Sequence, residues 1–343
     1  MILTIIFGFL FGLLLAIAHV NKNSVIAGMS TLEDFRVAKT MAAGIGLGII
    51  LISLFVLLGW AQYHTKPLIL GGIFWGGLLF GSGMAILGYC PGTLTISMGQ
   101  GSIDAFIGAL GGLVGGALFT VTKPSIQPIL DKELGNQYLY ANMLDYPLAY
   151  MLISLIFGAG IIYLSFLVHK RDKIKNMNWL YAGLGLGVLN AVMILDSTAG
   201  RPIGASTAFP YLADSLLGIT NNEYFKQIQV PGSWESYFLL GAFFAGLTYA
   251  LIRKEFKLQL IYEHWEKYKG TSKLRRIIWA LFGGFILIYG ARMAGGCTSG
   301  HILSGSMQFA KSSLFFAAFV FIGFLLTGKL FYKTKKMTEK NGK

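Results

Sequence analysis

The chain has 343 residues, of which 55% are hydrophobic and 13% are charged, and its formal net charge is +13. Soluble domains usually carry about 25% charged residues, so the composition excludes an ordinary soluble protein and predicts a polytopic membrane protein. A nucleic-acid partner is not expected, because the lysines and arginines concentrate in a few loops and in the tail and do not form one basic stripe.

Nine segments are long and apolar enough to predict membrane-spanning helices of about 20 residues each. The first is apolar from its second residue, with no basic stretch before it, so we expect a spanning helix and not a cleaved signal peptide. The predicted spans are 2–20, 39–60, 68–89, 103–122, 147–168, 178–196, 236–252, 277–296 and 312–332.

Four further stretches are apolar or rich in small residues but too short to cross a bilayer: 25–35, 92–101, 202–217 and 298–308. We predict that they form short re-entrant helices. Irregular backbone at membrane depth is tolerated only where it is buried in protein or lines a cavity. The short stretches are therefore expected to surround the functional site.

Basic residues indicate the orientation, because they cluster in the loops after the fifth and seventh spans and in the tail. Cytoplasmic loops carry the excess of lysine and arginine. The predicted protein is a multi-pass membrane protein with its N-terminus outside and its C-terminus in the cytoplasm.

The two halves of the chain resemble each other. Residues 28–31 (Gly-Met-Ser-Thr) match residues 204–207 (Gly-Ala-Ser-Thr), and one cysteine motif follows in each half. An unmatched fifth span between the halves would invert the second one, and inverted repeats place a transport site near the membrane midplane. The predicted division is a first repeat over 1–125, a linker with the fifth span over 126–175, a second repeat over 176–335 with a polar insertion at 219–235, and a basic cytoplasmic tail over 336–343.

Cys90 and Cys297 are the only cysteines, and each follows the break of a long apolar segment. Proline is favoured at the first position of a helix, so Cys90 with Pro91 after it predicts a helix N-terminus within the protein. Such an end attracts anions through free N–H groups and the helix dipole. Because thiols carry soft, polarisable sulfur, the predicted ligand is a small sulfur-containing anion that passes both cysteines. Its oxygens are expected to meet Gly92, Thr93, Thr298, Ser299, Gly300 and His301.

Other polar residues are candidates for the same pathway. Arg292 lies within an apolar span, where an arginine is costly and marks a functional site unless it reaches the interface. An entrance or second site is predicted at Ser30, Thr31, Arg201, Ser206 and Thr207, although helix-start capping explains the four hydroxyls as well. Asp104 is expected at the interface near a helix end.

Three alternatives remain open from the residues alone. The cysteines could be inert packing, they could bind a metal as part of a metal-ion transporter, or Cys297 could form a persulfide in a membrane sulfurtransferase or thiol redox protein. The metal reading is weak, because two cysteines and His301 show no C-x-x-C or H-x-x-x-H spacing. No phosphate-binding or dinucleotide motif occurs, so we expect a transporter without a cofactor and not an enzyme.

Residues 290–301 (Gly-Ala-Arg-Met-Ala-Gly-Gly-Cys-Thr-Ser-Gly-His), with Ser304-Gly305 after them, resemble the second motif of the YeeE/YedE family of bacterial sulfur-compound transporters. Residues 88–93 (Gly-Tyr-Cys-Pro-Gly-Thr) resemble its first motif. The resemblance implies uptake of thiosulfate, or of a related sulfur or selenium species, through the bacterial inner membrane, with Cys90 and Cys297 passing the ion along by S–H contacts to sulfur. Characterised thiosulfate transporters of the family have a further cysteine early in the first half, and the stretch 21–28 here has none.

The sequence thus predicts an all-α integral membrane protein with about nine transmembrane and four re-entrant helices in an inverted repeat. Its expected partners are a sulfur-containing anion, membrane lipid and a cytoplasmic sulfur-carrier protein that the basic inner face would dock.

Overall fold

A computed structural model describes residues 1–172 and 174–333; the predicted basic tail 336–343 lies outside the described residues. All regular structure in the described part is helical, which confirms the all-α prediction. The helices are α1 (Ile2–Ile17), α2 (Asn23–Ser30), α3 (Arg36–Leu57), α4 (Leu70–Leu87), α5 (Pro91–Gly99), α6 (Ile103–Leu130), η1 (Leu139–Asn142), α7 (Pro147–Arg171), α8 (Asn178–Ile194), α9 (Ala208–Leu217), α10 (Glu223–Ile252), α11 (Glu263–Lys269), α12 (Lys273–Met293), the π-helix η2 (Thr298–Gly305), η3 (Ser306–Gln308) and α13 (Lys311–Phe331).

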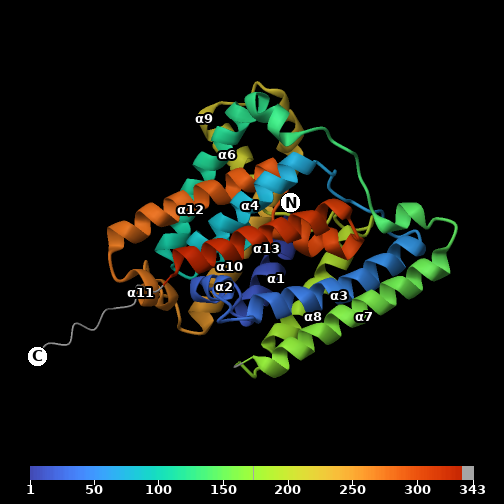
Figure 1. Cartoon of the computed structure of the whole chain (residues 1–343), viewed down its shortest axis with the longest axis horizontal. Coiled ribbons are helices and arrows are strands. Elements are labelled where there is room, and N and C mark those ends of the chain that lie inside the picture. The colour runs from blue at the N-terminus through green and yellow to red at the C-terminus, as the bar shows by residue number, and fades with distance from the viewer. Residues whose placement is uncertain (173, 334–343) are drawn as a thin grey trace, which may run out of the picture.

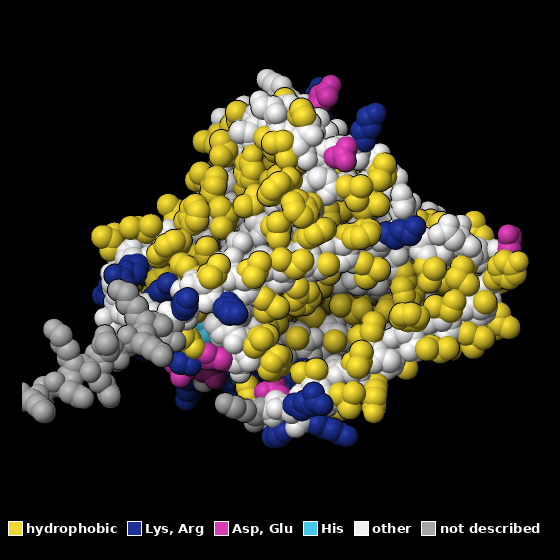
Figure 2. Space-filling model, in the orientation of Figure 1, with side chains coloured by type: hydrophobic (Ala, Val, Ile, Leu, Met, Phe, Trp, Pro, Cys, Tyr) yellow, Lys and Arg dark blue, Asp and Glu magenta, His cyan; other side chains and the backbone are white. Residues whose placement is uncertain are grey.

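Seven stretches of the described chain are long and apolar enough to cross a membrane: α3, α4 continued by α5, α6, α7, α10, α12 and α13. The apolar helices α1 and α8 are shorter, with 16 and 17 residues. These helices coincide with the nine predicted spans, so the class of multi-pass membrane protein is confirmed, while nine crossings stays a prediction. Figure 2 shows hydrophobic side chains covering most of one face, with lysine and arginine gathered along its lower left and lower edges.

One predicted boundary is wrong. The seventh span was expected to start at 236, but α10 begins at Glu223 and runs through Pro231, so most of the stretch 219–235 is helical. The Asn222 side chain caps this helix by accepting a hydrogen bond from the Phe225 amide at 2.8 Å. The strong cap at Asn222 explains why the helix starts before its apolar part does.

The helices pack in reciprocal pairs, as Figure 1 allows the reader to follow. α1 packs on α10 and α8 packs on α3, while α6 packs on α12 and α13 packs on α4. In the predicted repeat, α1, α3, α4 and α6 correspond to α8, α10, α12 and α13 in that order. The pair α1–α10 is then equivalent to the pair α8–α3, and the pair α6–α12 is equivalent to the pair α13–α4. These contacts support the predicted repeat, whose boundaries stay a prediction.

The contact between α4 and α12 has the same symmetry. A Cβ added to Gly76 would lie 2.6 Å from the Gly290 carbonyl oxygen, and one added to Gly83 would lie 2.8 Å from the Gly283 carbonyl oxygen. The two helices are therefore antiparallel and nearly touch through their backbones. The cysteines are 207 residues apart, and the same offset makes Gly283 the equivalent of Gly76 and Gly290 the equivalent of Gly83. The contact of Gly76 with Gly290 is therefore repeated by the contact of Gly83 with Gly283, as an inverted repeat requires.

α7 stands apart from these pairs. It lies along α3 at one edge of the molecule in Figure 1, and their backbones meet where Gly46 and Gly158 face each other. Only 17% of its most apolar window is buried within the protein. α7 therefore presents most of its surface to lipid and matches the unpaired fifth span of the sequence prediction.

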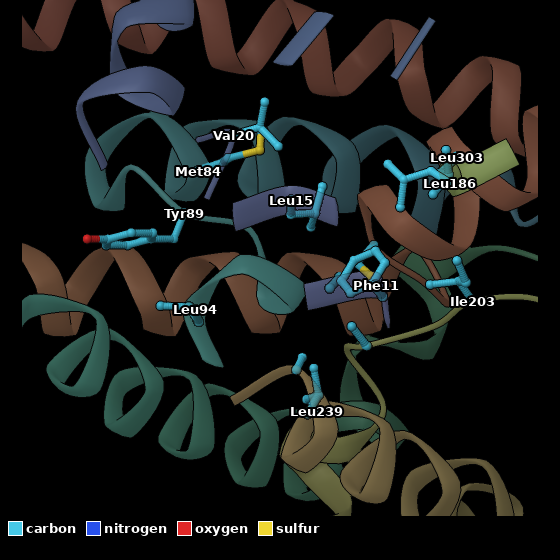
Figure 3. Close-up of a cluster of buried hydrophobic side chains, with 14 of the residues drawn as sticks. Phe11, Leu15, Val20, Met84, Tyr89, Leu94, Leu186, Ile203, Leu239 and Leu303 are labelled. Carbon is cyan, nitrogen blue, oxygen red and sulfur yellow. The ribbon is translucent and has the colours of Figure 1, made fainter. Parts of the chain in front are cut away.

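The buried core joins both halves (Figure 3). Phe11 and Leu15 of α1 lie near its centre, between Met84 and Leu94 on one side and Leu303 of η2 on the other. Cys297 belongs to this cluster and Cys90 packs against it. The core thus holds the two cysteine motifs inside the molecule.

Candidate functional site

Both cysteines lie where a long helix stops and a short one starts. α4 ends at Leu87 and Gly88 follows in the left-handed conformation (φ 80°), while Gly295 (φ 74°) has the same role after α12. Glycine adopts this conformation without the Cβ penalty and commonly ends helices. Cys90 then precedes α5 and Cys297 precedes η2, so each cysteine is the N-cap residue of a short helix.

The surroundings of the two thiols are similar, although only Cys90 forms a capping box with its helix. The Cys90 sulfur accepts the backbone N–H of Thr93, and the Thr93 hydroxyl accepts the Cys90 N–H at 2.9 Å. At the other motif the backbone N–H of Gly300 and the side chain of Ser206 lie within hydrogen-bonding reach of the Cys297 sulfur. Thr93 and Gly300 are both three residues after their cysteine. Each thiol is thus held by the third residue of the helix that follows it, at the positive end of the helix dipole.

The two short helices meet at their N-termini. A Cβ added to Gly92 would lie 3.4 Å from the Ser299 hydroxyl oxygen, so these positions, each two residues after a cysteine, lie against each other. The first turns of the two short helices therefore lie against each other in the protein interior. Such convergence favours a negatively charged ligand.

Two cavities flank this meeting point. The polar cavity has a volume of about 370 Å³, and its lining includes Lys66, Arg201, Ser206, Thr207, Glu235 and Cys297. The apolar cavity has a volume of about 360 Å³, and its lining includes Phe11, Leu15, Met41, Cys90, Thr298 and Ser299. The start of η2 lies between them, because Cys297 and Gly300 face one cavity while Thr298 and Ser299 face the other. The Thr298 hydroxyl is buried and has no hydrogen-bond partner in the described part of the protein.

Arg292 is buried and lines neither cavity, but it holds Ser206 and Thr207, which line the polar one. Its Nε donates to the Tyr224 hydroxyl at 2.8 Å, and its Nη1 donates to the hydroxyls of Ser206 at 3.2 Å and Thr207 at 3.1 Å. Thr207 is the residue before α9. The structure therefore brings three predicted site residues together and adds Tyr224, which the sequence analysis missed.

Arg201 lines the polar cavity with a partner that was not predicted. Its Nη2 lies 3.6 Å from Glu235 Oε1, and its guanidinium lies 4.3 Å from the centre of the Trp234 ring. Lys66 also lines this cavity and was missed. A charged residue in an apolar protein marks a possible functional site, and this signal could have singled out Lys66 and Glu235. Their positions far apart in the sequence do not show that the folded chain brings them together.

Other predicted residues do not join the site. His301 lines neither cavity; its Nδ1 lies 3.0 Å from the Ser313 hydroxyl and its Nε2 lies 3.0 Å from the Ala294 carbonyl oxygen. A carbonyl only accepts, so Nε2 carries the proton and His301 ties η2 to α13 and to the end of α12.

The expected helix start at Ser30 and Thr31 is wrong, since α2 ends at Ser30. Their hydroxyls donate to the carbonyls of Ala27 at 2.6 Å and Gly28 at 3.1 Å. Neither residue lines either cavity. The four-residue match between the halves therefore places similar sequences at opposite ends of their short helices.

A buried ion pair supports the Cys90 motif. Arg276 donates from Nη2 to the Leu87 carbonyl at 2.7 Å and from Nε to Asp104 at 3.1 Å, and the Tyr89 hydroxyl donates to Asp104 at 3.1 Å. Asp104 is 0% exposed and lies in the first turn of α6, near a helix end as expected, while its interfacial depth stays a prediction. The Arg276 side chain thus supplies hydrogen bonds to backbone carbonyls that the end of α4 leaves without helical partners. Such groups need partners within the protein where no water reaches them.

The sequence profile described as Sulphur transport matches residues 19–326 of the chain, which includes both cysteine motifs and the helices that hold them. The chain belongs to this sulphur transport family. It is also 26% identical over 333 residues to the thiosulfate transporter TsuA of Spirochaeta thermophila, an alignment that covers 92% of this chain and 94% of the relative. The resemblance suggested by the motifs is therefore confirmed, and the protein is a multi-pass membrane protein of a sulfur-transporting family.

In this member of the sulphur transport family, the described residues hold no group of three or more His, Cys, Asp or Glu side chains arranged to bind a metal ion. The site offers other chemistry: two thiols, converging helix N-termini, hydroxyls and a polar cavity with basic side chains. These groups suit a soft anion with oxygen atoms.

Proposed function

We propose that the protein imports thiosulfate across the bacterial inner membrane, with the anion passing Cys297 and then Cys90. Membership of the sulphur transport family and similarity to a thiosulfate transporter support the substrate. The observation that carries the mechanism is the placement of the two thiols as N-caps of short helices that meet between two cavities.

Each step of the proposed path has a physical reason. Lys66 and Arg201 attract the dianion into the polar cavity, where the Cys297 S–H meets its terminal sulfur. The anion then passes the contact between Gly92 and Ser299, which has to open for it, and backbone N–H groups and hydroxyls there replace its hydration shell. It reaches the Cys90 thiol and leaves towards the cytoplasm. No covalent bond forms, so the protein acts as a transporter and not as an enzyme.

The test is uptake of radiolabelled thiosulfate by cells that lack other thiosulfate transporters. We expect Cys90→Ala and Cys297→Ala to abolish uptake while the purified proteins keep the elution volume of the native protein. Serine variants separate the two roles of each thiol, because a hydroxyl caps a helix well but offers no soft sulfur. Cys90→Ser and Cys297→Ser should also fail to transport, and normal uptake by either would refute the relay.

The same samples test the reading as a sulfurtransferase. After exposure to thiosulfate, the intact mass should show no added sulfur on Cys297, because the proposed passage involves no persulfide. A stable adduct without uptake would replace the transport proposal by the enzymatic one.

We also propose that the basic loops around α11 face the cytoplasm, with the N-terminus outside. Figure 2 supports this, since dark blue side chains gather near α11 and near the turn between α7 and α8. A cytoplasmic sulfur-carrier protein with an acidic surface would find its complement there.

A further inference from the structure

Glu235 is a buried carboxylate inside a cavity proposed for an anion. It belongs to α10 and is 2% exposed, yet it lines the polar cavity together with Cys297. Its Oε2 accepts the Thr207 backbone N–H at 2.6 Å. The other oxygen, Oε1, lies 3.6 Å from Arg201 Nη2, too far for a hydrogen bond.

The absence of a side chain at Gly204 lets this carboxylate reach its place. A Cβ at Gly204 would lie 2.4 Å from Glu235 Oε1. The carboxylate thus occupies a defined position, with one oxygen bonded to backbone and the other turned to Arg201 and the Gly204 backbone.

A dianion and an ionised Glu235 would repel each other in this space. The cavity has a volume of about 370 Å³, so an anion bound beside Cys297 lies close to the carboxylate. Buried charges are screened much less than charges at the surface. Lys66 and Arg201 offset part of the repulsion, but Arg201 is already paired with Glu235. Neutralising Glu235 would remove the repulsion and release Arg201 for the incoming anion.

We infer that Glu235 takes up one proton when the anion enters the polar cavity, so that thiosulfate and a proton bind together. This inference rests on the proposed function and adds a coupling ion to it. The proton comes from the solution to which the cavity opens and binds to Oε1, the oxygen without the Thr207 bond. It offsets one of the two negative charges of thiosulfate and leaves Glu235 when the anion moves on.

Other titratable or charged groups face Glu235 from the surrounding elements. The loop before α4 supplies His64 and Lys66, the loop before α9 supplies Arg201, α12 supplies Arg292 and the start of η2 supplies Cys297. Arg201 and Arg292 are already protonated at neutral pH. Lys66 and His64 are the rival proton acceptors, because burial lowers the pKa of each. Nearby Arg201 and Lys66 also lower the pKa of His64, which leaves it neutral at pH 7 before an anion arrives.

The test is isothermal titration of the purified full-length protein with sodium thiosulfate in two buffers of different ionisation enthalpy. For the native protein we expect net uptake of about one proton per thiosulfate, and a Kd that weakens about tenfold per pH unit over the range in which that proton is taken up. Glu235→Gln keeps an oxygen for the Thr207 N–H but cannot ionise. It should bind thiosulfate with no proton uptake and with a Kd that does not depend on pH.

Two variants control for other groups. Glu223→Gln changes an exposed carboxylate at the start of the same helix and should behave like the native protein. His64→Asn should also keep the proton uptake. If proton uptake disappears in His64→Asn and persists in Glu235→Gln, the assignment to Glu235 is wrong. If the native protein binds thiosulfate without proton uptake, the inference is wrong while the proposed function stands. This measurement uses the native protein only, so it decides the matter even if the Glu235 variant fails to fold. Absence of any thiosulfate binding would overturn the proposed function as well.

Discussion

At the scale of single residues, the site depends on side chains that hold helix ends in place. The sequence was sufficient to predict Cys90 and Cys297 at helix N-termini, because glycine and proline around each cysteine act locally. Arg292 was predicted as a functional candidate, but its fork of contacts to Tyr224, Ser206 and Thr207 joins residues from three parts of the chain. Only the fold reveals such a network.

Arg292→Lys tests that fork. Lysine keeps the positive charge but cannot reach both sets of hydroxyls with one ammonium group. Leaving a buried polar group unpaired costs about 1–3 kcal/mol, so we expect KM for thiosulfate uptake to rise by about tenfold or more. Arg275→Lys, on the exposed first turn of the same helix, should leave uptake unchanged. Equal KM values for both variants would show that charge alone matters at Arg292.

At the scale of elements, the interruptions of the helices could be predicted better than their lengths. All four short stretches of the sequence analysis contain short helices: α2, α5, α9, and η2 with η3. The start of α10 at Glu223 could not be predicted from apolar residues, because Asn222 begins the helix in a polar stretch. Lys66 and Glu235 were missed for a related reason: each is an ordinary charged residue until the packing of α10 and the loop before α4 brings it to the cavity.

Gly76→Ala tests the close contact of α4 with α12. The added methyl group would meet the Gly290 carbonyl oxygen at 2.6 Å and the Ala294 backbone nitrogen at 2.7 Å. Backbone atoms cannot move aside as a side chain can, so we expect destabilisation of about 1–3 kcal/mol, measured as a lower unfolding temperature in detergent.

Gly160→Ala is the matched control, since no atom lies within 4 Å of its added Cβ and alanine favours the helix. It should unfold at the native temperature or slightly above. An unchanged unfolding temperature for Gly76→Ala would mean that the two helices can separate without loss.

At the scale of the whole molecule, reciprocal packing of the helices supports the inverted repeat that the sequence suggested from two short matches. The basic side chains along the lower left and lower edges in Figure 2 fit the orientation predicted from the loop charges, which stays a prediction. The sequence could predict this much because charge and hydropathy are summed over many residues. The division into two cavities could not be predicted, because it depends on which face of η2 each residue presents.

The orientation is tested by labelling single cysteines in a Cys90→Ala/Cys297→Ala background with a reagent that cannot cross membranes. Asp145→Cys lies before α7 on the side expected to face outward, and Glu266→Cys lies in α11 on the basic side. In intact cells whose outer barrier has been removed, Asp145→Cys should react at once and Glu266→Cys only after the membrane is permeabilised. The reverse pattern would show that the protein is inserted the other way.

The sparse contacts of α7 bear on how such a chain could arise. In the predicted repeat each half crosses the membrane an even number of times, so two copies fused directly would insert in the same direction. A duplicated gene could encode oppositely oriented copies on one polypeptide only after gaining an odd helix between them. In that repeat α7 is the odd crossing, in keeping with its packing mainly on α3, with Phe166 on Trp179 and Phe157 on Phe309 as further ring contacts.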